Sequence, residues 1–473
     1  MSENTTPFIH LFKTPLSYYC YDVNTNQIIG VDKETYDYFS NLSSEKNERL
    51  ELRLEPLRKR GIFSANRPKE MKHAASEYLK YELNENIQQM SLQLTQQCNF
   101  NCSYCTYAPK DFEYQREHSS KRISEETAFK ALEFFAAHAK NSQRLAIGFY
   151  GGEPLLEFEL IKKLIPYAEE LFEGKELYFT MTTNGSLLTP DKFEYLSKHD
   201  IHINISLDGP PEMHNRSRKF AANGMGTFDA IMRNLTQIKE KHPQKYRRIG
   251  FMITADSRFE NSGLYNFFDT NELFRYSNIR YNSINDNLSF EKHYMDESYV
   301  ITQNKLLFKA RLAEIGKYHG DISNITKSML KSTVERFEVS MKPRWKIGDT
   351  TSHSGPCVPG QRRLFVTVDG NFLPCERISE TSAPNIIGNL DEGFLLNKAD
   401  KVLNICELTE YDCKNCWAIT HCNLCVKFCD NNGEFSADFK IKNCQNSRRV
   451  AENVLMEYAS FHDIKKLMRG EKS

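Results

Sequence analysis

Residues 94–109 read LTQQCNFNCSYCTYAP, and their cysteines directly follow QQMSLQLT (residues 88–95), the first candidate β-strand of an alternating strand and helix pattern. The segment holds Cys98, Cys102 and Cys105, with three and then two residues between them. Three thiolates at this spacing can bind three irons of a [4Fe–4S] cube and leave the fourth iron open to another ligand. Zinc is the alternative, but it normally takes four closed ligands, and His118 is the one further Cys or His nearby. The spacing therefore favours an iron–sulfur cluster.

Composition and charge exclude several classes of protein. The 473 residues are 40% hydrophobic, 12% aromatic and 26% charged, which predicts a globular chain of two or three domains. Lys plus Arg and Asp plus Glu number 62 each, so the basic excess of a nucleic-acid-binding surface is missing. The sequence shows neither an apolar run near 18 residues nor the features of a signal peptide at its N-terminus, so we expect no membrane partner and a cytoplasmic location.

The thirteen cysteines are clustered rather than scattered. Three lie within residues 98–105 and nine within residues 357–444, while Cys20 stands alone in an apolar stretch. In a reducing compartment such clusters indicate metal ligands or catalytic groups rather than disulfides. Cys20 is expected to be a buried structural residue.

Three regions differ in pattern. Residues 1–85 predict a small hairpin-plus-helices module, and residues 340–450 are rich in cysteine and poor in long helical patterns, followed by a helical tail at 451–473. In residues 88–330 strand-like and helix-like segments alternate, which predicts an α/β fold with a parallel sheet, open or curled into a partial barrel. Chemistry in such folds lies at the carboxyl ends of the strands. The six expected strands are 88–95, 144–152, 177–185, 201–209, 248–256 and 278–286.

The cysteine motif, with Tyr104 before its last cysteine, resembles that of the radical S-adenosylmethionine (SAM) superfamily. The resemblance implies a partial (β/α)6 TIM-like barrel, SAM and a radical-generating [4Fe–4S] cluster as cofactors. It also implies the residues that bind the cofactor. These are Gly151, Gly152 and Glu153 at the methionine amino group, Asn184 and Ser206 at the ribose or carboxylate, Arg218 as a carboxylate partner, and Tyr104 of the cysteine motif.

Two residues near these positions have other interpretations. Asp208 begins an Asp-Gly-Pro sequence that is also typical of a plain turn. His214 is better interpreted as a structural histidine than as a catalyst.

The C-terminal cysteines resemble a SPASM domain, which carries two auxiliary [4Fe–4S] clusters. By this resemblance Cys413, Cys416, Cys422 and Cys444 hold the distal auxiliary cluster. The nearer auxiliary cluster takes Cys357, Cys375 and either Cys425 or Cys429, of which Cys425 needs the smaller change of spacing. Its fourth iron is either open to a substrate thiolate or bound by Cys406 or the spare cysteine, and paired C-x2-C units also leave zinc as an alternative.

Glu376 follows Cys375 at the position where sulfatase-maturing relatives carry an aspartate. A carboxylate beside a cluster and near a pocket could act as a general base. A surface charge paired with Arg377 is the alternative.

The N-terminal module resembles a winged-helix-like, PqqD-like peptide-recognition element, which would bind a leader peptide as an added strand. The whole chain most resembles SPASM maturases that form thioether crosslinks in cysteine-rich precursor peptides. That resemblance implies a precursor peptide and a reduced flavodoxin- or ferredoxin-type electron donor as partners. Two rivals are anaerobic sulfatase maturation, which deletion of residues 1–85 would discriminate, and a non-catalytic zinc scaffold.

Overall fold

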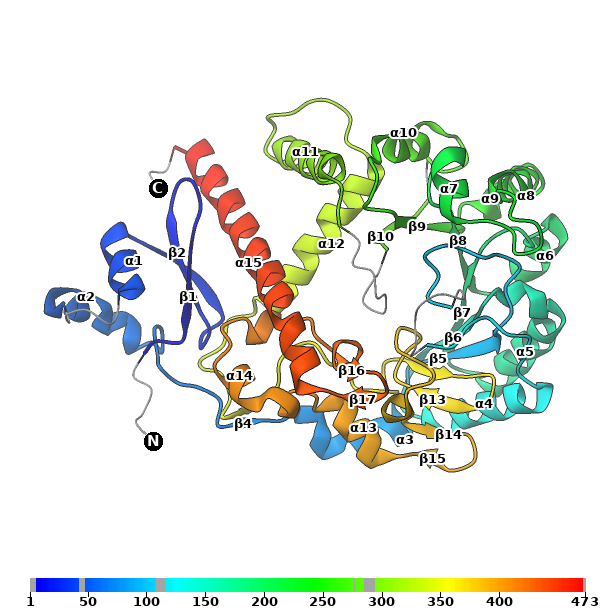
Figure 1. The fold of residues 1–473 in the computed structure, drawn as a ribbon, viewed down its shortest axis with the longest axis horizontal. Helices are drawn as coiled ribbons and strands as arrows, with labels where there is room; N and C mark the ends of the chain where they lie inside the picture. The colour runs from blue at the N-terminus through cyan, green and yellow to red at the C-terminus, as the bar shows by residue number, and fades with distance from the viewer. Residues whose placement is uncertain (1–5, 42–46, 108–114, 276, 285–293, 471–473) are drawn as a thin grey trace.

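The computed structural model describes residues 6–41, 47–107, 115–275, 277–284 and 294–470. Residues 108 and 109 of the cysteine motif lie outside them. Figure 1 shows a small N-terminal module on the left, the barrel on the right, and the long helix α15 (Ala437–Met468) between the module and the C-terminal region.

The N-terminal module is a three-stranded antiparallel sheet with two helices. Its strands β1 (Ile9–Lys13), β2 (Tyr18–Asp22) and β3 (Gln27–Val31) pair in chain order, so β3 forms one edge of the sheet. The helices are α1 (Lys33–Ser40) and α2 (Glu48–Arg58), capped by Asp32 and Asn47. Cys20 is fully buried in the core of this module, which confirms the sequence prediction.

Six parallel strands form the barrel, as predicted. Their spatial order is β10-β9-β8-β7-β6-β5, and the sheet does not close because β5 pairs on its other side with β12 (Leu364–Val366). Figure 1 shows the helices on the outer face of this curved sheet. The strands are β5 (Gln89–Thr95), β6 (Arg144–Gly151), β7 (Glu176–Thr183), β8 (Ile201–Ser206), β9 (Gly250–Ala255) and β10 (Ile279–Ser283). The helices are α4 (Glu125–His138), α5 (Phe158–Leu171), α6 (Pro190–Leu196), α7 (Pro211–Ser217), α8 (Phe228–Lys241), α9 (Pro243–Tyr246), α10 (Ser262–Thr270), α11 (Glu297–Glu314) and α12 (Asn324–Ser340).

Helix α4 illustrates how local sequence sets these elements. Ser124 accepts a hydrogen bond from the backbone N–H of Thr127 at 2.9 Å, which satisfies one of the free donors at the start of the helix. The apolar face of α4 buries Leu132 and Phe135 against the sheet. The cap predicted from the sequence is therefore present.

The C-terminal region begins by extending the barrel sheet. The apolar strand β12 pairs in parallel with the open edge of β5, and three further short strands follow it, so the sheet has ten strands among the described residues. Its other elements are β11 (Thr350–Thr351), β13 (Asn371–Leu373), β14 (Gly388–Asn389), β15 (Gly393–Phe394), α13 (Leu396–Leu403), α14 (Glu410–Lys414), β16 (Asp430–Asn431) and β17 (Glu434–Phe435).

The structure draws two boundaries differently from the sequence pattern. Helix α3 (Leu79–Glu85) packs away from the N-terminal module, because Leu79 and Leu83 belong to the barrel core. Met71 of β4 (Glu70–Met71) is instead buried with Phe12 of the module. The tail expected at 451–473 is the second half of α15, which begins at Ala437 inside the cysteine-rich region.

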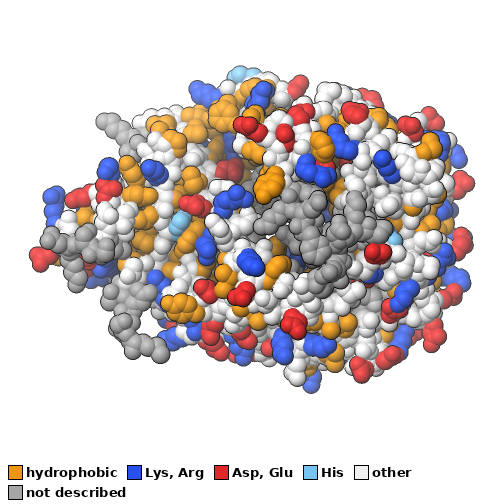
Figure 2. Space-filling model, in the orientation of Figure 1, with side chains coloured by type: hydrophobic (Ala, Val, Ile, Leu, Met, Phe, Trp, Pro, Cys, Tyr) orange, Lys and Arg blue, Asp and Glu red, His pale blue; other side chains and the backbone are white. Residues whose placement is uncertain are grey.

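The surface shows mixed charge. Figure 2 shows basic and acidic side chains interspersed over the face in view, in keeping with equal numbers of the two. In the part of the chain that the structure describes, no helix combines the length and apolar character needed to cross a membrane.

Candidate active site

The cysteine triad lies in the loop that leaves the carboxyl end of β5. Cys102 is buried, and the loop is fastened to the end of α7 by hydrogen bonds from the backbone N–H of Asn101 to Lys219 and of Ser103 to Ser217. Burial raises the pKa of the Cys98 and Cys102 thiols to about 12. In the absence of metal these thiols are therefore protonated at neutral pH, and iron must displace their protons.

Two glycines let β6 approach the beginning of this loop. A Cβ on Gly151 would stand 2.3 Å from the carbonyl oxygen of Thr95, and one on Gly152 would stand 2.2 Å from that of Gln97. The backbone N–H of Gly152 donates to Thr95 at 2.9 Å and that of Glu153 donates to Gln97 at 3.0 Å. The Gly-Gly-Glu motif therefore holds the root of the cysteine loop in place.

Glu153 is buried and its carboxylate is engaged by the protein. It accepts hydrogen bonds from the hydroxyl of Thr183 and the backbone N–H of Asn184, both at 2.7 Å, and from the backbone N–H of Leu155 at 3.0 Å. Burial raises the pKa of Glu153, and these hydrogen bonds oppose that effect. The residue joins the carboxyl ends of β6 and β7.

Asp208 connects three segments around the triad. Its carboxylate forms a bidentate ion pair with Arg218 at 2.7 and 3.2 Å and accepts from the hydroxyl of Tyr104 at 2.5 Å and from the backbone N–H of Thr254 at 2.9 Å. The carboxylate that Arg218 binds in this structure is thus a protein group. The positive charge of Arg218 also acts on Cys102, where it opposes the burial that raises that thiol's pKa.

His214 is hydrogen-bonded to the backbone of Asp208. Its Nδ1 accepts from the backbone N–H of Asp208 at 3.3 Å, and its Nε2 lies 2.9 Å from the hydroxyl of Thr227. Burial lowers the pKa of His214 to about 3, so the ring stays neutral. These contacts are those of a structural histidine.

Asn184 and Ser206 end β7 and β8 on the same rim as the triad. The side-chain amide of Asn184 donates to Asn99 at 2.7 Å, and Asn99 in turn donates to Ser186 at 2.9 Å, which ties the cysteine loop to the end of β7. Ser206 is half-buried. The sequence-predicted SAM residues therefore converge at the carboxyl ends of β5 to β8.

A polar network that sequence reasoning missed lies beside Cys105. Arg116 and Glu380 form a buried ion pair at 2.7 Å, Gln93 donates to both carboxylate oxygens of Glu380 at 2.8 Å, and the guanidinium carbon of Arg116 lies 3.9 Å from the ring centre of Tyr107. The one signal in the sequence was Gln93, a long polar side chain inside the predicted strand β5. The partners Arg116 and Glu380 are too far apart in sequence for any local pattern to join them.

Glu376 faces inward with one oxygen free. Its Oε1 accepts from Arg363 at 2.7 Å, whereas Arg377 is 3.8 Å away. Its Oε2 is buried and has no hydrogen-bond partner. The main partner of Glu376 is therefore Arg363 rather than the expected Arg377.

The predicted ligands of the nearer auxiliary cluster line one cavity. Cys357, Cys375 and Cys425 all border a cavity of about 1230 Å³. Cys429 does not border it; it is fully buried, and its thiol donates to the carbonyl of Cys425 at 3.5 Å. Cys406 also lies elsewhere, with its thiol 3.6 Å from the carbonyl of Met71.

The predicted ligands of the distal cluster line a second, smaller pocket. All four of Cys413, Cys416, Cys422 and Cys444 border it, together with the side chains of His353 and Lys440. Cys413 and Cys444 come from α14 and α15, so helix packing rather than sequence spacing brings the set together.

The cysteines fit clusters better than single metal ions. Among the residues with described positions, no three His, Cys, Asp or Glu side chains converge closely enough to bind one ion. Sulfur ligands of one zinc lie about 3.8 Å apart, given tetrahedral geometry and a Zn–S distance of about 2.3 Å. Thiolates of a cube bind different irons and are spread more widely. Cysteine thiolates are the usual ligands of [4Fe–4S] clusters, so the chemistry of the donor sets suits such clusters.

Comparison with known proteins assigns the domain. Residues 92–256 match the family model of the radical SAM superfamily. The chain therefore contains a radical SAM domain, a type that uses SAM and a [4Fe–4S] cluster.

The curated relatives include enzymes of different kinds as well as uncharacterized proteins. The radical SAM cyclopropyl synthase TigE of Paramaledivibacter caminithermalis is 28% identical over 170 residues, which cover 34% of this chain and 35% of that protein. A serine-type anaerobic sulfatase-maturating enzyme of Bacteroides thetaiotaomicron is 26% identical over 36% of this chain and 40% of the relative. The alignments thus span less than half of each relative.

A solved structure shares the fold over a larger share of the chain. Native anSMEcpe with bound AdoMet and the Cp18Cys peptide superposes with a TM-score of 0.55 at 19% identity, covering 77% of this chain and 99% of that one. At this identity the likeness shows the fold alone.

Proposed function

We propose that this chain is a radical SAM enzyme that installs thioether crosslinks in a ribosomally made, cysteine-rich precursor peptide. The observation that carries the proposal is the grouping of the cysteines: a triad at the carboxyl rim of the barrel, and two further sets that each border one cavity. The proposal is supported by the similarity to the sulfatase-maturating enzymes and to the radical SAM synthase TigE, and by the fold shared with anSMEcpe, whose structure holds a peptide.

Different residues would hold the radical-generating cluster, bind SAM and support the cysteine loop. Cys98, Cys102 and Cys105 would hold the radical-generating cluster, and the rim formed by the ends of β6, β7 and β8 would bind SAM through Gly151–Glu153, Asn184 and Ser206. When bound, SAM and the cluster supply a 5′-deoxyadenosyl radical that abstracts hydrogen from carbon. The Asp208–Arg218 pair would keep the cysteine loop in one conformation and exclude water beneath it.

Glu376 would be the base of the reaction. Forming a thioether breaks one C–H and one S–H bond. The carbon-bound hydrogen atom would go to the deoxyadenosyl radical and the thiol proton to a base, and the electron released as the C–S bond forms would go to an auxiliary cluster. Glu376 directly follows Cys375, and its Oε2 is buried without a hydrogen-bond partner. Burial raises the pKa of the Tyr150 phenol, and the nearby charge of Glu376 raises it further. Arg363 would hold the other oxygen and so fix the direction of the carboxylate.

The two auxiliary clusters would be held by the C-terminal cysteines. Cys357, Cys375 and Cys425 would bind the nearer one, and Cys413, Cys416, Cys422 and Cys444 would bind the distal one. Cys429 is the weaker candidate because it does not border the nearer cavity. A reduced flavodoxin- or ferredoxin-type protein would supply electrons.

The N-terminal module would hold the leader of the precursor. Strand β3 is an edge of its sheet, so its outward N–H and C=O groups can pair with an added strand. The module is fixed to the catalytic part, since Arg344 donates to the carbonyls of Val23 and Asn24 at 2.6 and 3.0 Å. A bound leader would therefore have a constant position relative to the barrel.

The test begins with the neighbouring reading frames. A short cysteine-rich peptide found there is offered in a turnover assay with and without its leader. We expect products that lose two hydrogen atoms per crosslink and whose cysteines no longer react with alkylating agents, with far slower modification of the leaderless peptide. A Cys98→Ala variant is the control for radical chemistry. Equal rates on both peptides would refute leader recognition, and unchanged peptide mass would refute the crosslinking reaction. The leaderless peptide is a better probe than deletion of residues 1–85, because that deletion also removes Leu79 and Leu83 from the barrel core.

Anaerobic sulfatase maturation is the second candidate. It is favoured by the extent of the shared fold with anSMEcpe and by Glu376, which stands where such enzymes carry an aspartate. Its product is an aldehyde, so a hydrazide-reactive peptide would identify it. Iron and zinc analysis separates both from a zinc scaffold, since three cubes require about twelve irons per chain.

A further inference from the structure

Helix α15 carries a lysine that is buried beside the distal cysteine set. Lys440 is fully buried, and its ammonium donates to the carbonyl of Ile405 at 2.9 Å, to the hydroxyl of Thr409 at 2.8 Å and to Sγ of Cys413 at 3.6 Å. A buried ammonium normally requires a negative partner. None of these three acceptors is a carboxylate, so the sulfur of Cys413 is the group that could carry the compensating charge.

A second donor lines the same pocket. His353 is buried, and its Nδ1 accepts from the backbone N–H of Gly355 at 3.3 Å, which leaves the ring proton on Nε2. That Nε2–H is buried and has no hydrogen-bond partner. Burial, assisted by the charge of Lys440, lowers the pKa of His353 to about 3, so the ring carries this one proton. A buried N–H without an acceptor is rare in folded proteins.

Both features have one explanation if the pocket holds an anionic group rich in sulfur. An iron–sulfur cube with four thiolates is negatively charged and becomes more so on reduction, and its reduction potential depends on nearby charge and on hydrogen bonds to sulfur. We propose that Lys440 and His353 are positioning residues of the distal cluster, where the ammonium offsets its charge and the imidazole N–H donates to one of its sulfur atoms. Together they raise its reduction potential, so that it accepts electrons more readily. This inference rests on the proposed function, which assigns a cluster to Cys413, Cys416, Cys422 and Cys444.

The experiment isolates the distal cluster. In a full-length background the triad, Cys357 and Cys375 are replaced by alanine, which should leave about four irons per chain. Midpoint potentials are then measured by anaerobic titration followed by electron paramagnetic resonance. Lys440→Met should favour the oxidised cluster at least tenfold. For one electron this corresponds to a midpoint potential about 59 mV more negative. His353→Leu should make the midpoint potential more negative as well, but by a smaller amount. His353→Gln keeps an N–H donor and should therefore lie between His353→Leu and the parent background.

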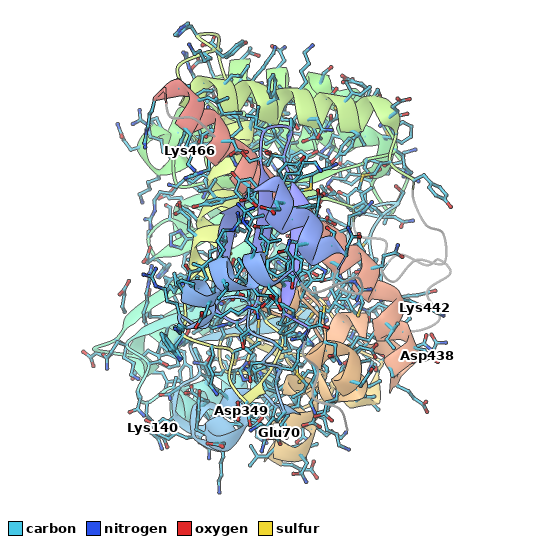
Figure 3. The ribbon with its side chains drawn as sticks, turned by 90° about the vertical axis from the view of Figure 1, so that its left-hand side faces the viewer. Glu70, Lys140, Asp349, Asp438, Lys442 and Lys466 are labelled. Carbon is cyan, nitrogen blue, oxygen red and sulfur yellow. The ribbon has the colours of Figure 1, made fainter. Side chains whose placement is uncertain are left out.

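Lys442→Met is the matched control. Lys442 lies two residues along α15, is exposed, and stands at the periphery of the view in Figure 3, so the same loss of charge should leave the potential unchanged. If Lys440→Met does not retain iron, the iron content of Lys440→Arg is measured instead. Iron retained by the arginine variant supports charge compensation, whereas loss of iron from both variants overturns it. Four irons with unchanged potentials in Lys440→Met and His353→Leu also overturn the proposal. A background without iron would instead refute the distal cluster of the proposed function, and the inference with it.

Discussion

Asp208 is the residue on which the geometry of the cysteine loop most depends. It receives Tyr104 from the loop, Arg218 from the end of α7 and the backbone of Thr254 from β9. The side chains of Tyr104 and Arg218 bury polar groups, and these groups depend on Asp208 for a hydrogen-bond acceptor. Loss of the carboxylate charge would leave the buried guanidinium of Arg218 without its ion pair.

Asp208→Asn is therefore expected to lower the free energy of unfolding by about 3–5 kcal/mol, the usual cost of leaving a buried charge unpaired. The measurement is denaturation of the anaerobically purified protein. Asp256→Asn is the control, because Asp256 pairs with the partly exposed Arg258 and should cost at most about 1 kcal/mol. Equal losses in the two variants would show that the Asp208 pair has no special role.

At the scale of elements, α15 links the distal pocket to the N-terminal module. Lys440 and Cys444 lie in its first turns, and Asp463 near its other end accepts hydrogen bonds from Thr14 at 2.6 Å, Ser17 at 3.0 Å and Tyr19. Asp463 is buried, so these bonds are shielded from water. One continuous helix thus connects Cys444, a proposed cluster ligand, with the attachment of the module.

Asp463→Ala should loosen that attachment, because three donors of the module lose their acceptor. We expect limited proteolysis to cut the chain between the module and β4 several-fold faster than in the parent protein. Glu457→Gln on the same helix serves for comparison, since Glu457 pairs with Arg311 of α11 and does not touch the module. Identical cleavage rates for the two variants would contradict the proposed attachment.

At the scale of the whole molecule, the cysteines tie stability to metal and to pH. Burial raises the pKa of Cys98 and Cys102 from the ordinary value of 9.0 to about 12, and that of Cys422 to about 11. A thiol whose pKa is higher in the folded chain than in the unfolded chain stabilises the fold below pH 9, and this contribution is lost as the pH rises toward 12. Thiolates bound to iron have already lost their protons, so the loaded protein lacks this dependence.

Removal of iron with a chelator should therefore make the chain alkali-sensitive. We expect the thermal midpoint of the chelated protein to fall between pH 8 and pH 10, and that of the loaded protein to change much less over the same interval. Parallel melting curves at both pH values, with and without iron, provide the measurement. A loaded protein that loses as much stability as the chelated one would argue against cysteine ligation.

Much of the fold could be predicted because its signals are local. The six barrel strands are short segments that alternate with helical segments along the chain, and Ser124 is the cap from which α4 begins. The sequence did not predict that α3 leaves the N-terminal module or that the tail is part of α15. The packing partners of these two helices lie far away in sequence. The same limit explains why β12 was not expected to join the barrel sheet.

The sequence by itself determined the cysteine triad, the Gly-Gly-Glu turn and the alternating strands and helices, because these depend on neighbours a few residues apart. Only the tertiary structure decided which partners the charged residues choose: Arg218 binds Asp208, Glu376 binds Arg363, and Lys440 lies against Cys413. It also showed that Cys425 rather than Cys429 borders the nearer cavity. A buried charge must find a partner wherever the packing of distant elements places one, and spacing along the chain carries no record of that.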